Sequence, residues 1–228
     1  MTATPAAVLW DMDGTLVDSE KVWTVSLAEA ARALGGELSA TAREDIIGSN
    51  LTRTLGIMFD DLGLPHEPQE MERTRRRILA RTGELFADGL EWRPGAQEAL
   101  RTVRAAGWPT ALVTNTGREL TELALDGIGR EHFTVTVCGD EVPRGKPDPD
   151  PYLRAALLLA VDAADCLAVE DSPTGALSAG RAGASVLVVP CEVPVPEAPG
   201  RVRRASLVGL SADDVRDSYT RARLGRVA

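Results

Sequence analysis

The chain has 228 residues, of which 44% are hydrophobic and 26% charged, the balance of an ordinary globular protein with a sizeable core. Its net charge of −9 argues against a nucleic-acid partner, because such binding depends on clustered cations that neutralise phosphates. No run approaches the roughly 20 apolar residues that cross a bilayer, and no basic segment precedes the first apolar run. We therefore expect a cytoplasmic protein without membrane association, either a monomer or a weak homodimer.

Short apolar runs rich in Val, Leu and Ala predict a set of buried β-strands. Most of these runs are continuous rather than alternating, as in strands that are covered on both faces. They span residues 6–10, 110–114, 134–138, 166–170 and 185–189, with a weaker candidate at 206–208. Helical patterns separate most of the later runs, at residues 95–106, 118–125, 150–159 and 174–182. Alternating strands and helices predict an α/β fold with a doubly wound parallel sheet and right-handed crossovers.

Residues 18–87 break this alternation, because they contain helical patterns and no strand-like run. The patterns are separated by glycine and proline, and they cover residues 20–34, 52–62 and 68–86. Such a stretch predicts an inserted α-helical domain, since insertion at a loop tip is well tolerated. We expect an α/β core from residues 1–17 and 91–228 and a helical domain from 18–90. The mixed-charge segment after Ser211 fits either a terminal helix or a partly disordered tail.

The first predicted strand is followed at once by Asp11-Met-Asp13-Gly14-Thr15. Ligands of open parallel sheets bind just beyond the carboxyl ends of the strands, and Gly14 allows the loop to curl so that both carboxylates reach one site. One carboxylate there can attack an electrophile while the other transfers a proton to the leaving group. The alternative is a plain turn, because Asp-Gly is a standard turn signal.

Polar residues also end two of the later predicted strands. Thr114 and Asn115 end one of them, where small polar groups and a helix N-terminus form either a phosphate cradle or a simple capped turn. Glu170 and Asp171 end another, in an apolar run where an unpaired carboxylate is costly, although helix capping also explains this segment. Lys146 lies in a loop stiffened by prolines, and its alternative is an ordinary solvated lysine.

Considered together, these motifs predict one site for a metal ion and a phosphate. Asp11, Asp13, Glu170 and Asp171 would repel one another at one rim of the sheet, by on the order of 4 kcal/mol for a like-charged pair roughly 4 Å apart. A divalent cation relieves that repulsion, and Mg²⁺ suits carboxylate, water and phosphate ligands. The same cation and Lys146 supply the positive charge that an acidic protein needs to hold an anionic substrate.

In their order and strand context these motifs resemble the haloacid dehalogenase superfamily, in its phosphatase branch with an inserted helical cap. The four motifs of that family match, in order, Asp11-x-Asp13-Gly14-Thr15, Thr114, Lys146 and Glu170-Asp171. The match extends over almost the whole chain and includes the position of the helical insertion. It implies a Rossmann-like core and hydrolysis of a small phosphate monoester, such as a sugar phosphate, through a phospho-aspartate.

The resemblance also implies a role for each residue of the motifs. Asp11 would be the nucleophile, and Asp13 the general acid and base. Thr114 and the backbone around Asn115 would hold the phosphoryl oxygens, and Lys146 would balance their charge.

The resemblance further implies how Mg²⁺ is held. Asp11 and Asp171 would bind the metal directly, together with the backbone carbonyl of Asp13. Glu170 would assist them.

Two rival functions remain open on the sequence. A β-phosphoglucomutase-like phosphotransferase is the nearer rival, but such mutases typically carry a cap histidine about a dozen residues after the nucleophile, where this chain has Trp23. A non-catalytic metabolite-sensing protein on the same fold is the other, and the intact motifs argue against it. The acid at Asp13 favours phosphoryl transfer over dehalogenation, because a departing halide needs no proton.

Substrate choice is expected to reside in the cap. Gly48-Ser49-Asn50 falls where such caps usually present a specificity loop, and Arg53 nearby can meet a second anionic group of the substrate. The arginines of residues 68–86 fit either the same role or a solvated helix face. Asp18-Ser19 fits the hinge into the cap. Trp23 and Trp92 fit either an apolar pocket wall or core or hinge packing, and we expect the packing role for each.

Overall fold

The computed structural model describes residues 3–226, and the strands of this range form one parallel sheet. The strands are β1 (Ala7–Trp10), β2 (Thr110–Val113), β3 (Val135–Val137), β4 (Cys166–Glu170), β5 (Ser185–Val188) and β6 (Arg201–Arg203). Neighbouring strands are parallel, in the order β3-β2-β1-β4-β5-β6. The predicted α/β fold with a doubly wound sheet is therefore confirmed.

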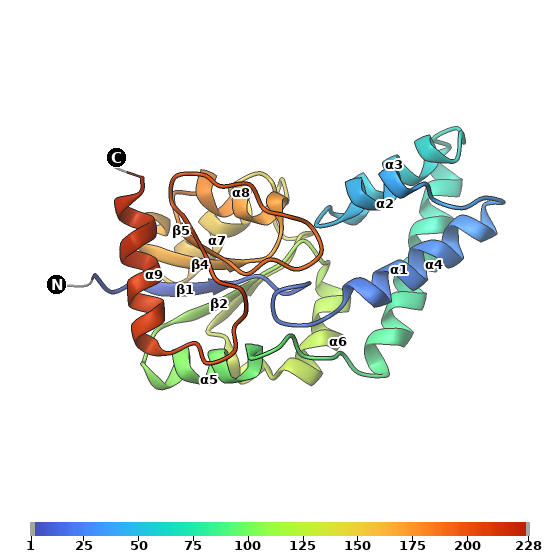
Figure 1. Cartoon of the computed structure of the whole chain (residues 1–228). Helices are drawn as coiled ribbons and strands as arrows, with labels where there is room; N and C mark the ends of the chain where they lie inside the picture. The colour runs from blue at the N-terminus through green and yellow to red at the C-terminus, as the bar shows by residue number, and fades with distance from the viewer. Residues whose placement is uncertain (1–2, 227–228) are drawn as a thin grey trace.

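Helices cover both faces of this sheet (Figure 1). They are α5 (Ala96–Ala105), α6 (Arg118–Ile128), α7 (Asp150–Leu158), α8 (Pro173–Arg181) and α9 (Ala212–Leu224), with 3₁₀ turns at Arg130–His132 and Ala163–Asp165. Helices α5, α6 and α9 pack on one face, and α7 and α8 pack on the other. On β1, Val8 and Trp10 enter the first layer and Ala7 and Leu9 the second. Because side chains alternate across a strand, burial on both faces requires the continuous apolar runs of the sequence.

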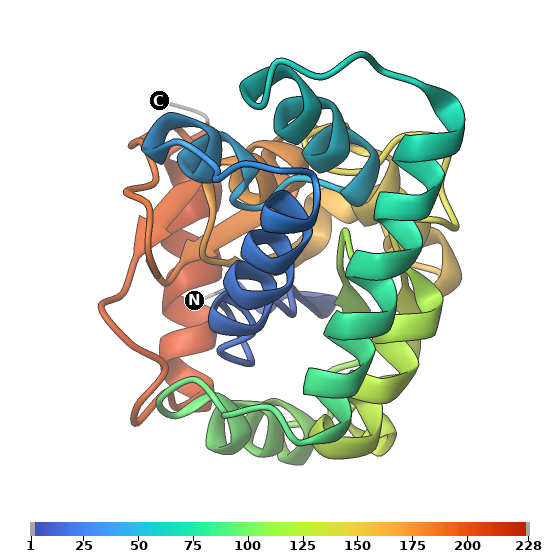
Figure 2. The ribbon, with the colours of Figure 1, turned by 90° about the vertical axis from the view of Figure 1, so that its right-hand side faces the viewer.

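The insertion after β1 is helical throughout. It consists of α1 (Glu20–Ala33), α2 (Ala40–Ile46), α3 (Leu51–Asp61) and α4 (Pro68–Ala87). These helices lie to the right of the sheet in Figure 1, face the viewer in Figure 2, and enclose a hydrophobic cluster that includes Leu27, Phe59 and Ile78. The two linkers to the core run side by side, and the Asp18 N–H donates to the Glu91 carbonyl at 2.8 Å. Among the helices of the described range, none is both long and apolar enough to cross a membrane.

The sixth strand is not where the sequence predicted it. Residues 206–208 form a turn in which the Val208 N–H donates to the Ser206 hydroxyl at 3.1 Å. The strand is β6, a short partly exposed segment with the sequence Arg-Val-Arg. Alternating charges leave no apolar run, so the pattern that identified the buried strands does not detect it.

Helix α2 lies outside the predicted elements, and α9 occupies the segment after Ser211. Helix α2 was not predicted; it is short, and the Ser39 hydroxyl caps it by accepting the Ala42 N–H at 3.1 Å. The segment after Ser211 is the helix α9, which begins with a capping box between Ser211 and Asp214. Of the two alternatives for this segment, the terminal helix is the one observed.

Candidate active site

The predicted catalytic loops meet where the strand order reverses. Strand β1 lies between β2 and β4, so Asp11, which follows β1, lies beside Glu170 and Asp171 at the end of β4. Thr114 follows β2 on the other side. Such a switch point, at the carboxyl ends of the strands, is where open α/β sheets bind ligands.

Lys146 is the centre of a buried ion cluster. Its Nζ lies 2.6 Å from Asp11 Oδ1 and 2.6 Å from Glu170 Oε1, and its side chain is 3% exposed. The Tyr152 hydroxyl donates to the same Glu170 oxygen at 2.6 Å, and the Ser172 hydroxyl donates to the other at 3.3 Å. Glu170 is therefore satisfied by three donors, and Lys146 joins it to Asp11.

Three carboxylates converge in a geometry suited to a cation. Oxygen atoms of Asp11, Glu170 and Asp171 lie within 4.8 Å of one another. Asp11 Oδ2 is buried and has no hydrogen-bond partner among the described residues. Three carboxylates with one ammonium, that of Lys146, carry two surplus negative charges, which a divalent cation would neutralise. Oxygen ligands of this kind fit Mg²⁺.

The pKa values of the clustered side chains also favour added positive charge at this site. Burial and the negative charge of Glu170 raise the pKa of Asp11 to about 8, against the lowering effect of Lys146. Burial and Asp11 raise the pKa of Asp171 well above its ordinary value. Burial disfavours the ammonium of Lys146, but Asp11 and Glu170 outweigh burial and raise its pKa. Both carboxyl groups therefore favour the protonated form more than an exposed aspartate does, and added positive charge, such as a bound cation provides, would favour their charged form.

Two glycines allow the carboxylates to lie against the backbone. Gly14 has a φ of 80°, and a Cβ at this position would lie 2.2 Å from Asp171 Oδ2. A Cβ on Gly175 would lie 1.9 Å from Glu170 Oε1. Any side chain at either position would displace a carboxylate, so Gly14 serves the carboxylate cluster as well as the turn.

The carboxylate of Asp13 is outside this cluster and accepts hydrogen bonds from four side chains. The hydroxyls of Thr114 and Thr116 donate to Oδ2 at 3.0 and 2.9 Å. The Ser19 hydroxyl and the Trp23 indole N–H donate to Oδ1 at 2.6 and 3.3 Å. The first pair comes from the loop after β2 and the second from the start of the helical insertion. Asp13 therefore joins the two parts of the molecule, and the fully buried Thr114 uses its hydroxyl to hold it.

The site opens into a cleft of about 1110 Å³ between the core and the inserted helices. The predicted residues that line it are Asp11, Asp13, Gly48, Ser49, Asn50, Arg53, Asn115, Lys146 and Asp171. The other two predicted residues, Thr114 and Glu170, are fully buried. The structure thus gathers the motif residues around one cavity, while Arg53 lines that cavity from the helical side.

The predicted specificity loop docks on the core. The side-chain amide of Asn115 donates to the Gly48 carbonyl at 3.0 Å, across the cleft. The hydroxyls of Ser49 and Thr54 share a hydrogen bond of 2.7 Å, and the Asn50 side chain caps α3. Most polar groups of the loop therefore fix its own conformation and its contact with Asn115.

Arginines on the helical side of the cleft complement the acidic core. Arg32, Arg43 and Arg53 line the cleft, are exposed, and form no ion pair within residues 3–226. The arginines of α4 mostly pair with glutamates, as expected for a solvated face: Arg73, Arg75, Arg76 and Arg81.

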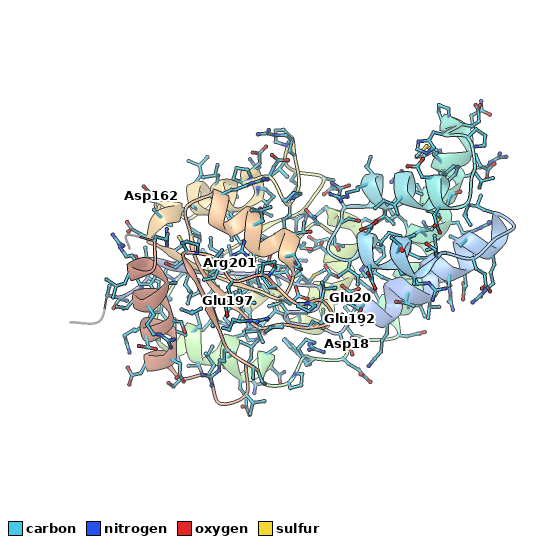
Figure 3. The ribbon with its side chains drawn as sticks, turned by 45° about the horizontal axis from the view of Figure 1, so that its top comes forward. Asp18, Glu20, Asp162, Glu192, Glu197 and Arg201 are labelled. Atoms are coloured by element: carbon cyan, nitrogen blue, oxygen red, sulfur yellow. The ribbon has the colours of Figure 1, made fainter. Side chains whose placement is uncertain are left out.

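An acidic group that the motifs did not predict lies beside the site. Burial, followed by the charges of Asp13, Glu192 and Asp18, raises the pKa of Glu20 to about 7. Figure 3 shows Glu20, Glu192 and Asp18 together at the junction of the core and the inserted helices. Glu20 and Glu192 also line the cleft.

Sequence reasoning missed other contacts for different reasons. Thr116 lies two residues after Thr114, so its position in a recognised motif was an available signal. Ser19 was assigned only to the hinge. Tyr152 lies on α7, 18 residues before its partner Glu170, and belongs to no motif. Only the packing of α7 on the sheet brings its hydroxyl to the site.

Comparison with known proteins links this constellation to a family. Residues 5–183 match a family model described as haloacid dehalogenase-like hydrolase. The chain is 34% identical over 193 residues to "Probable pseudouridine-5'-phosphatase" of Drosophila melanogaster, with 80% of each chain covered. It is 29% identical over 223 residues to hexitol phosphatase B of Escherichia coli strain K12, covering 92% of this chain and 96% of that one.

A solved structure shares the architecture as well. The crystal structure of CbbY from Rhodobacter sphaeroides in complex with phosphate superposes with a TM-score of 0.81 at 26% identity, covering 90% of this chain and 96% of that one. The chain belongs to the haloacid dehalogenase-like hydrolases. The family inferred from the four motifs is confirmed.

Proposed function

We propose that this chain is a Mg²⁺-dependent phosphatase of a small sugar or polyol phosphate, acting through a phospho-aspartate at Asp11. The environment of Asp11 carries the proposal. Lys146 holds one oxygen of this carboxylate at 2.6 Å, and the other is buried without a partner among the described residues. A carboxylate oriented at one oxygen and free at the other, beside a cleft, suits nucleophilic attack on phosphorus.

Relatives support the class of ester. Two of them are named as phosphatases, one of a hexitol phosphate and one of pseudouridine 5'-phosphate, and both substrates are phosphate monoesters of polyhydroxylated molecules. Exposed arginines on the far side of the cleft suit an anionic or hydroxyl-rich remainder of such an ester. Arg53 and the loop of Gly48, Ser49 and Asn50 are the proposed contacts in the cap, residues 18–90.

In the first step Asp11 attacks phosphorus in line, and the bond between phosphorus and the ester oxygen breaks. Asp13 gives a proton to the departing alcohol. Lys146 offsets negative charge on the phosphoryl oxygens, which the backbone around Asn115 holds in place. The Thr114 hydroxyl donates to Asp13 in this structure, so it holds a phosphoryl oxygen only once that bond to Asp13 breaks. When bound by Asp11, Asp171, the Asp13 carbonyl and the assisting Glu170, Mg²⁺ supplies further positive charge against the carboxylates and the phosphoryl group.

In the second step Asp13 takes a proton from water as the water oxygen bonds to phosphorus. The bond between Asp11 and phosphorus breaks, which restores the Asp11 carboxylate and releases inorganic phosphate. The helical cap shields the first step from bulk water and loosens for the second. Opening would break the hydrogen bond between Asn115 and Gly48.

A phosphate-release screen tests the proposal. Sugar, polyol and nucleoside phosphates are incubated with Mg²⁺ and either the wild type or Asp11→Asn. We expect release from a subset of the esters by the wild type and a loss of about 10⁴-fold or more in the variant, because an amide is not a nucleophile. A hexose 1-phosphate in the panel separates hydrolysis from mutase chemistry, which would form the 6-phosphate instead. Undiminished hydrolysis by folded Asp11→Asn would refute the assignment.

A further inference from the structure

Trp23 stands where the two hydrophobic units of the molecule meet. Its ring packs against both the core cluster and the cluster of the inserted helices. It meets Phe86 edge to face, with ring centroids 6.3 Å apart. From this position its indole N–H donates to Asp13 Oδ1 at 3.3 Å. A ring that is held by packing presents its N–H in a fixed direction.

Trp23 differs chemically from the other three donors to Asp13. An indole N–H can only donate a hydrogen bond. Ser19, Thr114 and Thr116 present hydroxyls, which can turn and accept instead. Of these four contacts, the one from Trp23 is therefore fixed in direction, and it orients the Asp13 carboxyl group.

We propose that Trp23 is a positioning residue that holds the Asp13 carboxyl group in the orientation from which it gives a proton to the leaving oxygen of the substrate. The inference rests on the proposed phosphatase function and on the role of Asp13 as its general acid. In the step concerned, the O–H bond of the Asp13 carboxyl group breaks together with the phosphorus–oxygen bond of the ester. The proton goes to the departing alcohol, and Asp13 is left as a carboxylate.

Dependence on the leaving group tests this role. Trp23→Phe keeps an aromatic ring and removes the N–H. A hexitol 6-phosphate releases an alcohol that needs a proton, whereas p-nitrophenyl phosphate releases a phenolate that needs none. The quantity compared is kcat/KM, because it reports only the steps up to and including the first irreversible one. It therefore excludes the hydrolysis of the phospho-aspartate, which both substrates share. We expect Trp23→Phe to lower kcat/KM about tenfold for the hexitol ester, the effect of one hydrogen bond to a charged group, and less than about twofold for the aryl ester.

Trp92→Phe is the matched control. Trp92 is partly buried against the same core cluster, and no side-chain hydrogen bond links its indole to another of residues 3–226. The same chemical change there is expected to leave both substrates unaffected. Trp23→His returns a ring N–H and is expected to recover part of the loss on the hexitol ester, which also covers the case in which Trp23→Phe does not fold.

Three results would overturn the inference. Equal losses on both esters would assign Trp23 to packing or cap closure, and no loss on either would leave the N–H without a role. Equal activity of Trp23→His and Trp23→Phe on the hexitol ester would also show that the N–H has no role. Absence of phosphate release by the wild type from every ester of the screen would defeat the proposed function itself, and it is recognised without any variant.

Discussion

The two sides of the cleft hold their charges in different ways. On the core side, Asp11 and Glu170 are buried, and each lies 2.6 Å from the buried ammonium of Lys146. On the helical side, exposed arginines such as Arg32 and Arg53 line the cleft. Buried charges must neutralise one another, so their geometry is fixed before substrate arrives. Solvated cations carry no such constraint, and they suit the recognition of a variable part of the substrate.

The strongest test of the core side is Lys146→Met. It leaves Asp11 and Glu170 without their buried counter-charge, so we expect the free energy of unfolding to fall by about 3–5 kcal/mol at neutral pH and phosphate release to be lost. Urea denaturation and a phosphate assay measure the two effects. Lys21→Met changes the only other lysine of the sequence, whose side chain is 71% exposed, and should alter stability by less than about 0.5 kcal/mol. Equal effects of the two variants would contradict the contrast between buried and exposed charges.

Metal binding gives the next largest effect. Mg²⁺ at about 100 times its Kd should raise the free energy of unfolding by about 2.7 kcal/mol, because it binds only the folded carboxylates. The measurement is a thermal melt with Mg²⁺ and again after chelation. Asp171→Asn removes one ligand and should lose most of this stabilisation, whereas Asp45→Asn, an exposed acid on α2, should retain it. Full stabilisation of Asp171→Asn would place the cation elsewhere.

Glu20 sharpens the comparison, because it is an acid at the boundary between the two sides. Its folded pKa of about 7 exceeds the ordinary value of 4.5, so the folded state retains a proton that the unfolded state loses. Stability should therefore fall as pH rises from about 4.5 to about 7 and then level off. Glu20→Gln removes this loss and should be more stable than the wild type at pH 8, by about 2 kcal/mol for this partly exposed side chain, but not at pH 4. Glu91→Gln, whose side chain is 81% exposed, is the control in metal-free melts across this range. A pH-independent gain in Glu20→Gln would assign the effect to packing.

The smallest effect is expected on the helical side. Arg53→Ala should raise KM about tenfold, about 1.4 kcal/mol, and leave kcat nearly unchanged, because a contact with the non-reacting part of the ester acts equally in the ground and transition states. Steady-state kinetics on the best ester of the screen measure this. Arg77→Ala, an exposed arginine of α4 that does not line the cleft, should change neither constant. A fall in kcat for Arg53→Ala would move that residue to the reacting centre.

The sequence by itself determined the buried strands of the sheet and the residues of the motifs. Strands β1, β2, β4 and β5 begin and end within one residue of the predicted runs, because a parallel strand that is buried on both faces must be apolar at each position. Asp11, Lys146 and Asp171 were predicted to share one site, and the structure brings them together, because the carboxyl ends of parallel strands meet at one edge of the sheet. A local sequence pattern and the order of the strands are enough to predict these properties.

Only the tertiary structure decided the partners of these residues. The hydroxyl of Tyr152 reaches Glu170 because α7 packs on the sheet, and nothing near either residue in the sequence indicates it. Trp23 was predicted as core or hinge packing, and its ring does pack there, but the contact of its N–H with Asp13 depends on how the helical insertion is set against the core. The direction of a hydrogen bond between separate elements follows from their packing, so short-range sequence patterns do not predict it.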